Sequence, residues 1–206
     1  MAHMYRFFTA PQVWLLQVER EPGELEVVTE RLPEGEAPLC FMSPVDAHIE
    51  GIFRAKPGLR YYVIEASNLT ERWFLRTNGL LVALLHLAWV GQSGRVMLRP
   101  SGKPCRFLRT WIEAADGKPP FAFELDGGTL EVVDRLYEQA GLFAWRETSE
   151  AASKWTFVQY LDAANLAVRS AHAVTRSDDC PGEELMLFDP EFRQWHAVPR
   201  VAVETE

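Results

Sequence analysis

The chain has 206 residues, of which 48% are hydrophobic and 24% charged, enough to bury the core of one domain. This composition excludes a disordered chain, a collagen and a coiled coil. The formal net charge of −8 disfavours nucleic acid and anionic membrane surfaces as partners.

The first residues read Met-Ala-His-Met, which is typical of an expression scar at residues 1–3. We expect a single domain over residues 4–206, with a weak subdivision near residues 113–120. The longest apolar run, Leu80 to Val90, is about half as long as a membrane span. We therefore expect neither a membrane-spanning segment nor a signal peptide.

Cysteine usage indicates the compartment. The three cysteines, Cys40, Cys105 and Cys180, lie far apart in the sequence. An odd and sparse count is typical of a reducing compartment and disfavours a disulfide framework. We therefore predict a cytoplasmic protein, and the excess of arginine over lysine points to a GC-rich bacterial genome.

Short strands are expected at the start of the chain. Alternating side chains predict strands over residues 5–9 and 13–19, and a third strand over 25–29. These three strands are expected to form an antiparallel meander. A polar loop over residues 32–38 and a short apolar strand over 39–42 follow.

A helix is expected over residues 43–55. Ser43 fits the N-cap and Pro44 the first turn, and Asp46 lies near the positive end of the helix dipole. A strand rich in tyrosine, valine and isoleucine follows over residues 59–66.

The middle of the chain allows two interpretations. Asn78-Gly79 is a strong hairpin signal, so residues 73–77 could pair with residues 80–84. The stretch Leu80–Val90, however, is rich in leucine and alanine, which favour a helix. We prefer a buried helix that is capped by Asn78.

Three further elements are expected after this stretch. Residues 95–99 and 104–111 predict a hairpin, and residues 121–125 predict a strand. A helix then begins after Asp126 and ends at Gly141, which fits the C′ position.

Residues 149–175 carry apolar side chains at spacings of three and four, which predicts one long helix, although residues 155–161 alone could form a strand. The runs 185–188 and 195–198 predict a final hairpin, and residues 176–184 fit a mobile loop. The whole pattern predicts an α+β fold in a single domain, with a mainly antiparallel sheet packed with three or four helices.

Charge is segregated along the chain. Residues 72–112 contain seven arginines and lysines and no aspartate or glutamate. This window could hold an anion such as a phosphate or a carboxylate. Alternatively, the glutamates of residues 19–36 fold back on it and neutralise it internally, which is the usual fate of charge runs.

A strand at the centre of this window would place Arg95, Met97 and Arg99 on one face, with Val96 and Leu98 turned toward the core. The anion hypothesis therefore assigns the ligand contacts to a small set of basic residues on the predicted hairpin. The set is Arg95, Arg99, Lys103 and Arg106.

No specific catalytic, cofactor or metal motif is present. Ser101-Gly102-Lys103 lacks the spacing and the following helix of a phosphate-binding loop. Cys105 is interpreted as a buried and inert cysteine. Asp46 and Glu50 line up on one helix face without His48, which disfavours a metal site. We therefore expect no catalytic residue, no cofactor and no metal ion.

Aromatic residues form 12% of the chain and can build either a core or an interface. The leading hypothesis is a non-catalytic protein-binding module, such as an inhibitor, immunity protein or adaptor, whose protein partner has a basic surface. The alternative is a small-ligand enzyme or sensor that binds an anionic molecule through the basic 95–109 hairpin. The expected partner contacts are Glu24, Glu26, Glu30, Phe192 and Trp195.

Overall fold

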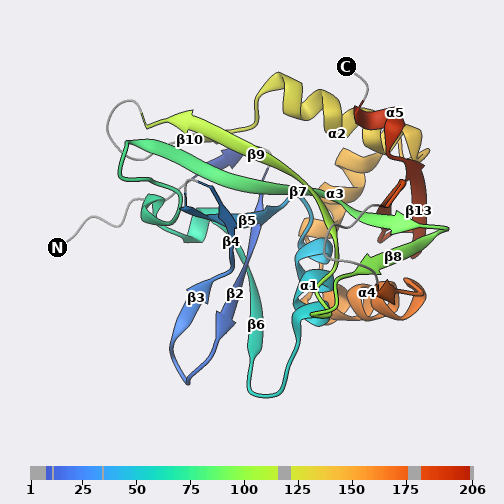
Figure 1. Ribbon diagram of the computed structural model, residues 1–206, viewed down its shortest axis with the longest axis horizontal. Coiled ribbons are helices and arrows are strands. Elements are labelled where there is room, and N and C mark those ends of the chain that lie inside the picture. Colours follow the sequence, from blue (N-terminus) through green and yellow to red (C-terminus); the bar gives the residue numbers. More distant parts are fainter. Residues whose placement is uncertain (1–7, 11, 34, 116–121, 176–181, 205–206) are drawn as a thin grey trace.

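A long central strand organises the sheet. The computed structural model describes residues 8–10, 12–33, 35–115, 122–175 and 182–204. Within them, strand β7 (Leu80–Gln92) pairs with β5, β8, β9 and β12, and a mostly antiparallel sheet is built around it (Figure 1). Four helices, α1–α4, pack against this sheet, which confirms the predicted α+β class and helix number.

The main path through the larger sheet is β11-β8-β7-β5-β2-β3, and β1 and β10 form a separate parallel pair. The strands are β1 Phe8–Ala10, β2 Trp14–Glu19, β3 Leu25–Val27, β4 Thr29–Leu32, β5 Gly35–Phe41, β6 Arg60–Glu65, β8 Arg95–Leu98, β9 Arg106–Ala114, β10 Ala122–Glu124, β11 Val174–Thr175, β12 Glu184–Asp189 and β13 Gln194–Pro199.

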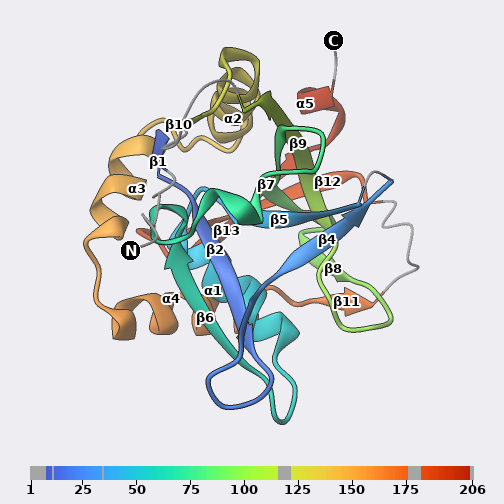
Figure 2. The same ribbon diagram turned by 90° about the vertical axis from the view of Figure 1, so that its left-hand side faces the viewer.

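The helices lie on both faces of the sheet. They are α1 Pro44–Arg54, α2 Gly127–Gln139, α3 Trp145–Ser153, α4 Phe157–Ser170 and the short C-terminal α5 Val201–Glu204. Helices α1 and α4 pack together on one face, and α2 contributes to the core on the other (Figures 1 and 2). Both faces of β7 are therefore buried.

The expected helix over residues 80–90 is wrong, because this stretch is the interior of β7. Its odd-numbered leucines, such as Leu85, pack into the core that contains α2, while Leu84 packs into the core beside α1. A strand that is covered on both faces carries no polar alternation, so its sequence resembles a buried helix. Of the alternative hairpin, the structure retains a single bridge between Leu75 and Leu81.

One long helix over residues 149–175 is also wrong. Helix α3 ends at Ser153, and α4 starts after Thr156, which accepts from the Gln159 backbone N–H while the Gln159 side chain bonds back to Thr156. This capping box starts a new helix within an unbroken apolar pattern. Residues 155–161 do not form a strand either, because α4 begins at Phe157.

Two smaller predictions need correction. The expected loop over residues 32–38 contains most of β5, which pairs with β4 in a tight hairpin. Met97 is fully buried beside Val96 rather than projecting with Arg95, since both faces of β8 are covered.

A further correction concerns strand pairing. The expected antiparallel meander of the first three strands is wrong, because β1 pairs in parallel with β10 and only β2 and β3 are antiparallel neighbours. Strands β8 and β9 each pair with β7, and a single bridge between Leu98 and Pro104 remains of their expected hairpin.

The predicted helix ends and the final hairpin agree with the structure. Ser43 caps α1, with its hydroxyl oxygen accepting from the Val45 N–H, and Pro44 occupies the first turn. Gly141 follows α2 with a φ of +76°, a conformation that favours glycine. Strands β12 and β13 form the expected antiparallel hairpin. The scar at residues 1–3, residues 176–181 of the expected loop and most of the suggested boundary at 113–120 lie outside the described residues.

The prediction about cysteine is only partly right. Cys105 is fully buried, as expected, but it forms a disulfide bond. Cys40 is a free, buried thiol. Within the described ranges, no helix is long and apolar enough to cross a membrane.

Candidate functional site

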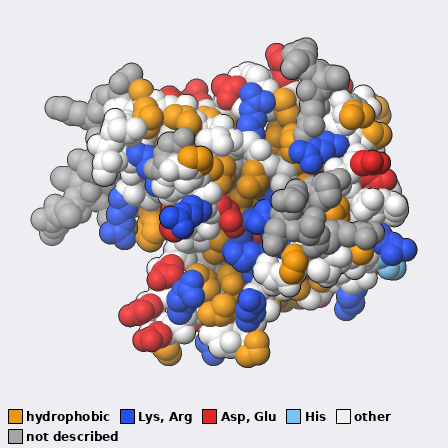
Figure 3. All heavy atoms as spheres, viewed as in Figure 1, with side chains coloured by type: hydrophobic (Ala, Val, Ile, Leu, Met, Phe, Trp, Pro, Cys, Tyr) orange, Lys and Arg blue, Asp and Glu red, His pale blue; other side chains and the backbone are white. Residues whose placement is uncertain are grey.

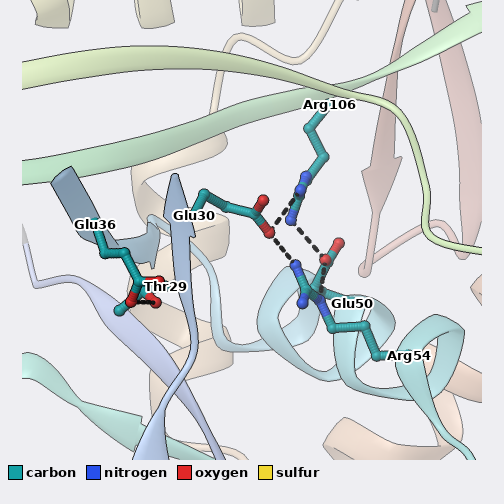
Figure 4. Close-up of polar contacts among 6 residues, drawn as sticks. All are labelled: Thr29, Glu30, Glu36, Glu50, Arg54 and Arg106. Carbon is teal, nitrogen blue, oxygen red and sulfur yellow. Dashed lines mark hydrogen bonds and ion pairs between the residues drawn. The ribbon is translucent and has the colours of Figure 1, made fainter. Parts of the chain in front are cut away.

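A buried network of four charged side chains lies between α1, β4 and β9 (Figure 4). Arg106, at the start of β9, donates to Glu50 of α1 and to Glu30 of β4, at 2.8 Å in both cases. Arg54, one helical turn after Glu50, donates to the same two carboxylates. The network ties α1 to the two strands.

Burial makes this network costly to break. Glu50 is 0% exposed, and both guanidinium groups are almost completely buried. Burial opposes the ionisation of Glu30, but Arg106 and Arg54 overcome this effect and lower its pKa. Removing one charge leaves the two opposite charges to share a single buried partner, which costs stability.

The basic residues assigned to an anion site are separated by the fold. Arg106 belongs to the buried network, and Lys103 lies close to it. Arg99 is partly buried, and its Nε has no hydrogen-bond partner among the described residues. Arg95 is exposed at the start of β8, beside His172. Figure 3 shows Lys and Arg side chains near the middle of one face and acidic side chains at the end of the β2–β3 hairpin.

The five residues assigned to a partner surface also have different surroundings. Glu24 is exposed, Glu26 forms an exposed ion pair with Arg20, and Glu30 belongs to the buried network. The indole N–H of Trp195 donates to the Ala167 carbonyl, and its ring packs against Trp89. Phe192 is 69% exposed.

Phe192 leads to a different site, a pocket with a volume of about 130 Å³. Its walls come from four places: the junction of β5 and α1, the end of α2, helix α3, and the turn between β12 and β13. The described lining residues are Met42, Ser43, Asp46, Tyr137, Gly141, Leu142, Phe143, Ala144, Trp145, Thr148, Ser149, Ala152, Phe188, Asp189, Pro190, Glu191 and Phe192.

Local sequence signals shape the pocket mouth. The left-handed Gly141 turns the chain out of α2, so that Phe143 lies in the connection to α3. On the other side, an Asp189 carboxylate oxygen accepts from the backbone N–H groups of Glu191 and Phe192. These bonds hold the β12–β13 turn, as aspartate commonly does. Phe143 is 78% exposed, so two large aromatic rings line the same opening.

Buried acids line the interior of the pocket. Asp46 is 7% exposed, and its carboxyl has no hydrogen bond within the part of the chain that the structure describes. Burial raises the pKa of Asp46 to about 8. The Tyr137 hydroxyl has a raised pKa because of burial and because Asp46 and Asp189 both act on it. These three groups therefore share one polar region beneath the phenylalanine rings.

Sequence reasoning missed Asp46, Phe143 and the role of Glu50. Asp46 was interpreted as a partner of the helix dipole, and its position at the start of α1 is correct. The signal available in the sequence was the composition of α1, which lacks a continuous polar face. In agreement with this, eight consecutive residues of the helix, Pro44–Gly51, are buried in the structure. A charged residue in such a helix must be paired or neutral.

The described residues contain no group of three His, Cys, Asp or Glu side chains that could hold a metal ion. The fold is α+β, and the site is a pocket with acidic lining residues and two exposed phenylalanines at its mouth. Comparison with protein-family models, with curated proteins and with solved structures found no match to this chain.

Proposed function

We propose that the protein is a non-catalytic binding module, an inhibitor, immunity protein or adaptor, and that it binds a protein partner at the rim of the pocket. The observation that carries this proposal is the pair of exposed rings, Phe143 and Phe192, at the mouth of one apolar pocket. Exposed aromatic side chains around a pocket are typical of interface hot spots.

The size and charge of the pocket support a protein partner. Small-molecule sites usually enclose roughly 300 Å³ or more, well above the volume found here. Asp46, Asp189 and Glu191 line the pocket, and none of its described lining residues is basic. The site therefore favours a partner with a basic surface.

Capture from an extract of the source cells tests the proposal. The wild-type protein should retain a specific protein that the double variant Phe143→Ser/Phe192→Ser does not retain. Phe157→Ser is a matched control, because Phe157 is 65% exposed on α4, outside the pocket lining. Equal capture by all three proteins, or no specific capture by the wild type, would contradict the proposal.

A second candidate function is binding of a small anion beside the buried network, as a sensor or enzyme would do. Two observations favour it. Counting Lys103, three cations face two carboxylates there, and the Nε of Arg99 has no partner among the described residues. Burial lowers the pKa of Lys103, and the nearby Arg54 lowers it further, so an anion would relieve this repulsion.

Thermal stabilisation by phosphate, nucleotides and organic acids tests this second function. One class of anion should raise the Tm by several degrees, and Lys103→Ala should abolish the rise. Lys56→Ala, which removes an exposed lysine, should leave the rise intact. No rise with any anion would reject this function.

The cytoplasmic location and the bacterial origin remain part of this proposal. The disulfide at Cys105 weighs against a reducing compartment. Labelling of free thiols in protein taken directly from cells tests the location, because a cytoplasmic protein should be labelled at Cys105 after denaturation.

A further inference from the structure

The pocket is matched in volume to one long side chain. Its volume is about 130 Å³, and a cavity of roughly 150 Å³ is known to hold one benzene molecule. A lysine side chain has five non-hydrogen atoms, four carbons and one nitrogen, against six in benzene, so the two are of similar size. The rest of the partner would remain outside, against the two phenylalanine rings.

The chemistry of the lining selects among side chains. Trp145, Leu142 and Phe188 provide apolar walls, and Asp46 lies deeper, with most of its surface buried. An apolar stem with a charged end fits such a pocket better than an entirely apolar side chain does, because Asp46 has no hydrogen bond among the described residues. The apolar stem can pack against the rings of Phe143 and Phe192 at the mouth while the charged end reaches the interior.

We propose that the pocket receives a lysine side chain of the partner protein, with its methylene stem between the rim phenylalanines and its ammonium group against Asp46. This inference rests on the proposed function and adds the identity of the group that is recognised. Arginine fits less well, because its planar guanidinium group is larger than an ammonium group and is fixed in shape.

Binding of lysine is then linked to a proton. Asp46 is protonated in the free protein near neutral pH, since burial raises its pKa to about 8. An ammonium guest requires the carboxylate, so Asp46 must release a proton when the guest binds, and affinity must rise with pH. The other titratable groups facing this region are Tyr137 of α2, Asp189 of β12 and Glu191 of the turn, with His196 of β13 at 3.9 Å from Asp189.

An NMR titration with n-butylammonium, which reproduces the lysine side chain, tests the inference without the partner. We expect saturable shifts of the backbone amide signals of residues 42–46 and 188–192, except for the prolines at positions 44 and 190, which have no N–H. Butan-1-ol, which lacks the charge, and propylguanidinium, which mimics arginine, should bind at least ~10-fold more weakly. Binding should be roughly 25-fold tighter near pH 8.5 than near pH 6.5, because the fraction of Asp46 that is ionised rises by this factor.

Two variants complete the experiment. Asp46→Asn should lose the binding and its pH dependence, while Asp162→Asn, which removes an exposed acid from α4, should behave as the wild type. The spectrum of each variant shows whether it is folded. Equal binding of butan-1-ol, tighter binding of propylguanidinium, or unchanged binding to Asp46→Asn would overturn the inference.

Failure of this inference is distinguishable from failure of the proposed function. If Phe143→Ser/Phe192→Ser abolishes capture of a partner while n-butylammonium does not bind, the rim is a contact surface but lysine is not the group recognised. If capture is unaffected by the rim variant, the proposed function itself is wrong.

Discussion

The carboxyl group of Asp46 has lost most of its contact with water without gaining a hydrogen bond from the described residues. Its pKa rises from an ordinary value of 3.8 to about 8 in the folded protein because of burial. The unfolded chain therefore releases this proton at lower pH than the folded protein does. The associated stability is complete below pH 3.8 and is lost as pH rises to about 8.

Asp46→Asn should therefore stabilise the protein, by about 2–4 kcal/mol near pH 8 and by little near pH 4. Urea unfolding at several pH values measures the difference between variant and wild type. Comparison of the variant with the wild type cancels the contribution of His48, which is present in both. Burial lowers the pKa of His48 to about 4, so its contribution to stability increases with pH, whereas that of Asp46 decreases. Equal urea midpoints at pH 8 would show that Asp46 is solvated.

Unlike Asp46, the buried side chain of Arg106 has two charged partners, Glu30 and Glu50. Arg106→Met keeps most of the stem but leaves Glu30 and Glu50 to share Arg54. We expect a loss of about 3 kcal/mol in the free energy of unfolding, because a buried ion pair is broken from one side. Arg95→Met, at an exposed position of β8, should change it by less than about 0.5 kcal/mol. An unchanged urea midpoint for Arg106→Met would mean that the network is solvated.

At the scale of the elements, β7 and the chain entering β12 approach each other closely. A methyl group at Gly182 would collide with the backbone carbonyl oxygen of Gly91 and with the Val90 side chain. Gly182→Ala should therefore destabilise the protein by about 2 kcal/mol. Gly127→Ala, at the start of α2 with open space around it, should stabilise it by roughly 0.5 kcal/mol. Thermal unfolding compares the two, and an equal Tm for both variants would contradict the close packing.

The elements that sequence reasoning predicted correctly carry local signals. Ser43 and Pro44 start α1, Gly141 ends α2, and an Asp-Pro turn joins β12 to β13. The errors occur where tertiary contacts decide. Leu80–Gln92 is a strand because helices cover both of its faces, and its own residues favour a helix.

Within the candidate site, Phe192 was identified from the sequence because it lies in an evident turn. The place of Asp46 in the first turn of α1 was predicted correctly, but its burial was not, because the periodicity of α1 does not show that α2, α3 and the β12–β13 turn surround this end of the helix. Arg106 was assigned to an anion site and Glu30 to a protein-binding surface, but the fold brings the two side chains together. Such pairing across 76 positions of sequence leaves no local signal.

At the scale of the whole molecule, the charge segregation seen along the chain is partly neutralised in three dimensions. Arg106, which belongs to the basic window of residues 72–112, forms ion pairs with Glu30 and Glu50. This supports the interpretation that the charges pair internally at this position. The pocket mouth lies elsewhere, and its described lining residues include acids and no base. The binding surface that we propose is therefore the acidic pocket rather than the basic hairpin.

The most direct test places a photo-crosslinking phenylalanine analogue at position 143 of the protein in its source cells. We predict a covalent adduct with one partner protein from position 143, and none from position 157, which has a similar exposure on α4. Adducts of equal yield from both positions, or no adduct from position 143, would contradict the claim that the pocket rim is the binding surface.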